Sequence, residues 1–69
     1  MIQNNDEMKA TKERIRYFQI QVERLRIVEN NPHNYRAPAG GYLAEIDRMS
    51  LEVREYLSVH PSDMKDQAA

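Results

Sequence analysis

The chain has 69 residues and a mass of 8.2 kDa, with 41% hydrophobic residues, 30% charged residues and a net charge of −1. This length excludes an α/β enzyme fold and a multi-strand barrel, and leaves room for one small domain. The near-neutral charge argues against a protein that holds nucleic acid by bulk electrostatics. No apolar run approaches the roughly 18 residues of a membrane span, and the first residues lack the regions of a signal peptide. Since cysteine is also missing, we expect a cytoplasmic protein without disulfides.

The first predicted element is a helix from about residue 6 to about residue 29, preceded by a disordered segment over residues 1–5. Six residues recur at steps of three and four, the spacing of a heptad seam. They are Met8, Thr11, Ile15, Phe18, Val22 and Leu25. Asp6 and Glu7 favour the helix start because the helix dipole attracts acidic side chains there. Asn31 and Pro32 indicate the end, since asparagine tolerates a left-handed cap and proline cannot continue a helix.

Residues 30–39 are predicted to form the loop between two helices. The polar cluster His33, Tyr35 and Arg36 falls within this range. Tyrosine and arginine are common interface anchors, and binding residues often lie on loops, so these three residues are candidates for binding a partner. Tyr35 equally suits a role in closing the end of the helix pair, because a tyrosine ring is amphipathic.

The second predicted helix runs from about residue 40 to about residue 59. Its expected seam is Leu43, Ile46, Ser50, Val53 and Leu57, flanked by Tyr42, Met49 and Tyr56. Pro38 suits the first helical position, where a missing N–H costs nothing. Gly40 and Gly41 weaken the first turn by about 1 kcal/mol each relative to alanine. Pro61 ends the helix, and residues 61–69 are predicted to be a disordered tail.

Together these elements predict an all-α fold, a two-helix antiparallel hairpin. If the chain folds back at residues 34–35, Phe18 faces Ser50 and Val22 faces Ile46, which sets large residues against smaller ones.

Apolar residues outside the seam predict that the hairpin self-associates. On the first helix Tyr17, Ile20, Ile27 and Val28 lie away from the seam, and Leu51 interrupts the polar side of the second. A helix that is apolar on two faces is usually covered on both, and chains this short usually need a partner for stability. We therefore predict a homodimer that forms an antiparallel, coiled-coil-like four-helix bundle.

The sequence contains no recognisable arrangement of catalytic or metal-binding residues, so we expect a protein without enzymatic activity, cofactor or metal. The histidines, His33 and His60, are far apart in the sequence, whereas a zinc site needs several ligands at fixed spacing. The expected function is a protein–protein interaction or regulatory module that acts as a homo-oligomer on an unidentified protein partner. The alternative is a dimeric regulator that binds nucleic acid through a basic stripe, Lys9, Lys12 and Arg16, although a charge of this density makes nucleic acid the less expected partner.

One stretch of the second helix resembles the Ser-Gln-Glu-Leu-Asp signature of small sporulation phosphatases, which are also helical hairpins. It reads Ser50-Leu51-Glu52-Val53-Arg54. Ser50 and Glu52 match the signature, but Arg54 replaces its defining acid. The resemblance therefore implies a hairpin fold and not the phosphatase activity.

Overall fold

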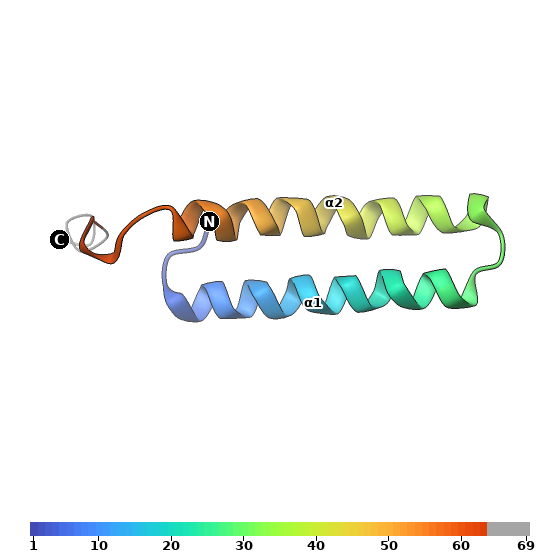
Figure 1. Ribbon diagram of the computed structural model, residues 1–69, viewed down its shortest axis with the longest axis horizontal. Helices are drawn as coiled ribbons and strands as arrows, with labels where there is room; N and C mark the ends of the chain where they lie inside the picture. The colour runs from blue at the N-terminus through green and yellow to red at the C-terminus, as the bar shows by residue number, and fades with distance from the viewer. Residues whose placement is uncertain (64–69) are drawn as a thin grey trace.

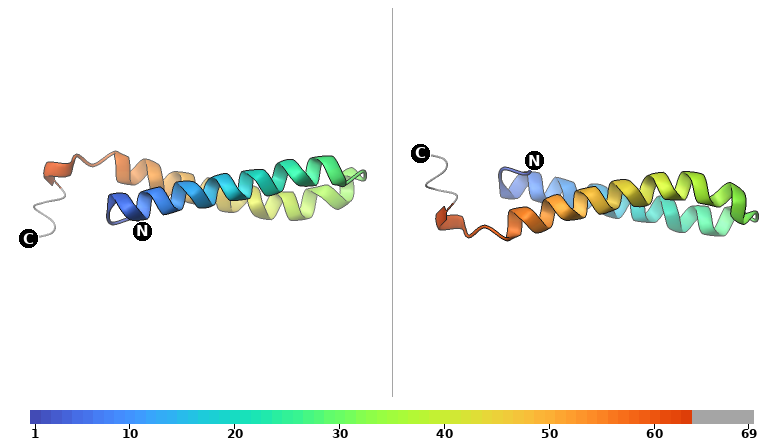
Figure 2. Two further views of the ribbon diagram at one scale, coloured as in Figure 1. Left: turned by 90° about the horizontal axis from the view of Figure 1, so that it is seen from below. Right: turned by 90° about the horizontal axis from the view of Figure 1, so that it is seen from above.

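The computed structural model describes residues 1–63, which form two long helices packed side by side as an antiparallel hairpin (Figure 1). Helix α1 spans Asn5–Val28 and helix α2 spans Pro32–Leu57. The Cα trace measures 53 × 15 × 13 Å, the dimensions of a single pair of helices packed about 8–10 Å apart. Seen edge-on, the helices cross at a shallow angle (Figure 2). The predicted all-helical hairpin is confirmed.

The start of α1 is fixed by its capping side chains. The Oδ1 atom of Asn4 accepts a hydrogen bond of 2.8 Å from the backbone N–H of Glu7, and the carboxylate of Glu7 accepts one of 2.6 Å from the N–H of Gln3. These bonds satisfy backbone donors that have no partner inside the helix. The helix ends within one residue of the predicted position, at Val28.

Helix α2 begins at Pro32, so the prediction of a loop over residues 30–39 is wrong. Asn31 is the N-cap, and its side chain accepts a hydrogen bond of 2.9 Å from the N–H of His33. Pro32 takes the first helical position, the role that the sequence analysis gave to Pro38. The same Asn-Pro pair therefore ends the connection from α1 and starts α2, which leaves only residues 29–31 between the helices.

The first half of α2 is helical despite poor helix-forming residues. Pro38 lies inside the helix, where its missing N–H cannot donate to the carbonyl four residues earlier, and Gly40 and Gly41 follow it. Packing against α1 offsets this cost, because Tyr35 is half-buried and Ala39 is only 2% exposed. Here tertiary contact decides the backbone conformation against local propensity.

The early turn also changes which residues face each other. The rings of Phe18 and Tyr42 pack edge to face with their centroids 5.4 Å apart, and the hydroxyl of Tyr56 donates a 2.7 Å hydrogen bond to the side chain of Asn5. The predicted pairing of Phe18 with Ser50 is therefore wrong. The prediction fails because the turn lies earlier in the chain than expected. When the centre of a turn moves by one residue, the residue that faces a given position on the other helix changes by two.

The core lies along the line between the helices. Every member of the seam predicted for α1 is buried or half-buried, and the buried residues within residues 1–63 are Ile2, Val22, Ala39, Ile46 and Met49. On α2 the row toward α1 contains Tyr42, Met49 and Tyr56, together with Ile46 and Val53. Leu43, Ser50 and Leu57, which were predicted to belong to the seam, are exposed, so the helix is rotated from the predicted orientation.

The N-terminal residues cross from α1 toward α2 (Figure 1). Ile2 is 8% exposed, and the terminal ammonium of Met1 lies 4.0 Å from the carboxylate of Glu52. The structure thus contradicts the prediction that residues 1–5 are disordered. Of the tail predicted over residues 61–69, residues 61–63 are helical and residues 64–69 lie outside the described residues.

Candidate interaction surfaces

One exposed apolar surface follows the side of α1 that points away from α2. Ile20 lies two residues from both Phe18 and Val22 of the seam, which places it on the opposite side of α1 from the face that contacts α2. Ile27 bears the same relation to Leu25 and is 80% exposed. Tyr17 and Val28 extend this area and are also exposed. We call these four residues, Tyr17, Ile20, Ile27 and Val28, the α1 outer surface.

Leu51 does not belong to this surface. It lies two residues from Met49 and from Val53, so it points away from α1 on the outer side of α2, where it is 50% exposed. The five residues predicted to mediate self-association therefore lie on opposite edges of the hairpin. A single contact between two hairpins cannot bury all five at once.

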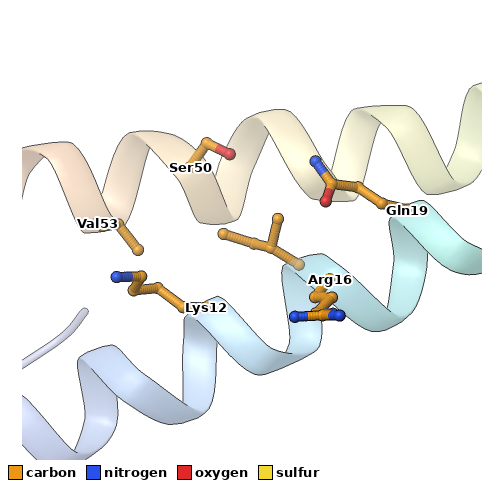
Figure 3. Close-up of a pocket in the computed structure, with 6 residues that line it drawn as sticks. Lys12, Arg16, Gln19, Ser50 and Val53 are labelled. Carbon is orange, nitrogen blue, oxygen red and sulfur yellow. The ribbon is translucent and has the colours of Figure 1, made fainter.

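A groove of about 470 Å³ runs between the helices on one face of the hairpin (Figure 3). It is lined by Lys12, Ile15, Arg16, Gln19, Ser50 and Val53. Its lining is mostly apolar, because Ile15 and Val53 contribute to it from the two helices and Ser50 adds only a small side chain. Lys12 reaches toward Val53, so its ammonium borders the groove (Figure 3).

Next to the groove, α2 carries the residues that its rotation leaves exposed. Leu43 and Leu57 are 47% and 64% exposed and stand seven residues on either side of Ser50. We call these three residues, Leu43, Ser50 and Leu57, the α2 stripe. Their repeat is visible in the sequence but was predicted to face α1, and the groove beside it follows from the orientation of α2, which the repeat alone does not give.

The opposite face of the hairpin is polar. Arg48 pairs there with Glu45 at 2.6 Å and with Glu52 at 3.4 Å. The hydrogen bond from Arg48, and then its positive charge, hold the pKa of the Glu45 carboxyl below its ordinary value. The matches to the phosphatase signature are divided between the faces, since Ser50 lines the groove and Glu52 joins this ion-pair cluster.

The predicted partner-binding cluster lies on the first turns of α2 and not on a loop. His33 and Arg36 are exposed there, whereas Tyr35 is half-buried. Tyr35 lines a small hollow at the turn with Arg26, Glu29, Asn30 and Pro32. Of its two possible roles, this position favours closing the end of the hairpin.

The basic stripe on α1 is accessible. Lys9, Lys12 and Arg16 are all exposed, and none of them forms an ion pair with another residue in the part of the chain that the structure describes. Lys12 and Arg16 lie at the groove. The stripe is thus free to meet an anionic group at one edge of the groove.

Residues 1–63 hold no group of three or more histidine, cysteine, aspartate or glutamate side chains placed to bind a metal ion. The ring of His60 hydrogen-bonds to the Ser62 hydroxyl at 2.7 Å. Neither helix in this part of the chain has the length and apolar character to cross a membrane. Comparisons of the chain with known protein families, with curated proteins and with solved structures find no match.

Proposed function

We propose that the protein is a non-enzymatic interaction module that acts as a homodimer, in which two hairpins pack into a four-helix bundle. The observation that supports this proposal is the balance of buried and exposed apolar side chains. Among residues 1–63, five hydrophobic residues are buried, whereas nine large hydrophobic residues remain exposed. A thin hairpin leaves most of each helix in water, and a second copy would cover part of that surface.

The exposed area has the size that such an interface requires. The chain exposes 5745 Å², whereas a compact monomer of its mass would expose about 4,500 Å². The excess of about 1,200 Å² is of the same order as the roughly 800 Å² that each partner buries in a standard interface. A dimer with an interface of that size would therefore remove part of this excess.

Sedimentation equilibrium tests the dimer directly. We expect twice the mass of the chain at micromolar concentration, and a melting temperature that rises with protein concentration because association stabilises the folded state. Circular dichroism during thermal unfolding measures the second quantity. A monomer that unfolds cooperatively at a temperature independent of concentration would contradict the proposal.

The alternative function is nucleic-acid binding by the dimer, and the accessible basic stripe of Lys9, Lys12 and Arg16 favours it. Binding of a labelled DNA or RNA duplex, measured by fluorescence anisotropy, would then weaken steeply as salt rises. Replacing all three residues by glutamine should abolish this binding. If no binding occurs even at low salt, the alternative is wrong and the interaction module stands.

A further inference from the structure

We propose that the second copy docks along the α2 stripe, with the two α2 helices antiparallel about a two-fold axis near Ser50. This inference rests on the proposed homodimer and specifies which of its surfaces forms the contact. The occupant of the groove side of the hairpin is thus another molecule of the same chain.

The apolar arc of α2 is wider than its contact with α1. Met49 and Tyr56 face α1, while Leu43 and Leu57 stand on the adjoining side and remain exposed. A helix that contacts two neighbours in a bundle needs such a wide arc, since a single partner covers a narrow seam. The α2 stripe therefore has the position expected for contact with a second helix.

The stripe is symmetric about its centre. Because Leu43 and Leu57 are each seven residues from Ser50, an antiparallel copy centred on Ser50 places Leu43 opposite Leu57 of the second copy, twice over. Fourteen residues of helix span about 21 Å. The α1 outer surface runs from Tyr17 to Val28, eleven residues or about 16 Å, so it is the shorter of the two surfaces.

The small side chain at Ser50 suits the centre of such a contact. The two-fold axis sets Ser50 opposite Ser50 of the second copy, and two small side chains at the centre let the helices approach closely.

Charges beside the stripe complement each other only in the antiparallel arrangement. Asp47 follows Leu43 by four residues, and Arg54 follows Ser50 by four, so both lie along the same margin of the stripe. Antiparallel pairing about Ser50 brings Asp47 next to Arg54 of the second copy, again twice. In a parallel pair, Asp47 would instead lie level with Asp47 of the second copy and Arg54 level with Arg54, so opposite charges would not meet. Within residues 1–63 neither side chain has an ion-pair partner.

The remaining face of the hairpin suits a second copy less well. Arg48, Glu45 and Glu52 already form ion pairs there, and Met1 and Ile2 cover part of the same area. Burying this cluster would require removal of its water without a new partner for each charge. The α2 stripe contains no such ion-pair cluster and is therefore the better interface.

Charge exchange tests the arrangement. In the homodimer of Asp47→Arg, the introduced arginine lies next to Arg54 of the second copy at both contacts. In the homodimer of Arg54→Asp, the introduced aspartate lies next to Asp47 of the second copy. We expect the homodimer of each variant to dissociate at least about tenfold more readily than the wild type, since like charges across an interface are destabilising. An equimolar mixture of the two variants restores both attractive contacts, so we expect it to form a heterodimer with affinity near that of the wild type. Sedimentation equilibrium measures the affinities, and circular dichroism measures the helix content.

The matched controls carry the same charge changes on the outer side of α1, at Glu13→Arg and Arg24→Asp. They should dimerise like the wild type. As a second measurement, Leu57→Gln should weaken the dimer more than Ile27→Gln, although Ile27 is the more exposed residue.

The outcomes separate this inference from the proposed function. If the wild type dimerises but the mixture does not reassociate, or if the α1 controls dissociate as readily as the α2 variants, the α2 interface is wrong and the homodimer stands. If the wild type is a stable monomer, both proposals are wrong. Only restored affinity in the mixture of the two variants supports the antiparallel α2 contact.

Discussion

The two helices differ in how many apolar rows they carry along the contact line. Helix α1 has one row through Phe18 and Val22, and all of it faces α2. Helix α2 has two rows offset by one residue, one through Tyr42 and Met49 and the other through Leu43 and Ser50. The comparison shows that hydrophobic periodicity orients a helix only when its apolar arc is as narrow as one contact.

The largest effect is expected from the residue that decides the orientation of α2. Met49 is 1% exposed, so Met49→Ala should lower the free energy of unfolding by about 2–5 kcal/mol through lost burial and the cavity that remains. Leu51→Ala is the control on the outer side of the same helix and should cost less than about 1 kcal/mol. Urea unfolding followed by circular dichroism measures both. Equal losses would mean that the Met49 row does not face α1.

A second prediction concerns the start of α2. Pro38→Ala should stabilise the protein by about 1–3 kcal/mol, because it restores a helical N–H and removes a steric clash inside the helix. Pro32→Ala should change stability little, since proline is well accommodated at the first position. Thermal unfolding of both variants compares the two sites. If Pro38→Ala is as neutral as Pro32→Ala, the helix begins at Pro38, as the sequence alone suggested.

The ends of α1 were predictable because local signals at each end agree. Asp6 and Glu7 mark its start, and the Asn-Pro pair marks its end. The start of α2 was not, because Pro32 and Pro38 both fit a first helical position. The choice between them depends on the burial of Ala39 against α1, a tertiary contact that no local signal encodes.

The candidate surfaces were predictable to a different extent. Ile20 and Ile27 could be recognised as exposed because they lie two residues from an unambiguous seam. The groove could not, because it lies beside Ser50, which the predicted orientation of α2 placed in the contact with α1. An error of a few residues in the turn was enough to give Phe18 the wrong partner.

A third prediction measures this register through the pair Phe18 and Tyr42, whose ring centroids are 5.4 Å apart. A double-mutant cycle with Phe18→Leu and Tyr42→Leu should give a coupling energy of about 0.5–1.5 kcal/mol. A cycle between Phe18→Leu and Ser50→Ala should give a coupling near zero. Coupling in the second cycle instead of the first would support the register that places the turn at residues 34–35.

The smallest expected effect concerns the polar face of α2, where Glu45 and Arg48 are paired at 2.6 Å. Arg48 lowers the pKa of Glu45 from its ordinary value of 4.5 in the folded protein. The pair therefore stabilises the fold above that ordinary value, and this contribution is lost as the pH falls through the lowered pKa, because the unfolded chain then binds the proton more readily. Both side chains are exposed, so the effect should be modest and weaker at high salt.

Comparing the wild type with Glu45→Gln by urea unfolding across this pH range isolates that contribution. The wild type should be the more stable protein at neutral pH, and the difference should vanish in acid as Glu45 becomes protonated. Repeating the comparison at high salt separates charge from packing. A difference that persists unchanged in acid would mean that the Glu45 side chain acts through its contacts and not its charge. The ion pair would then not be what distinguishes the polar face of α2 from its groove face.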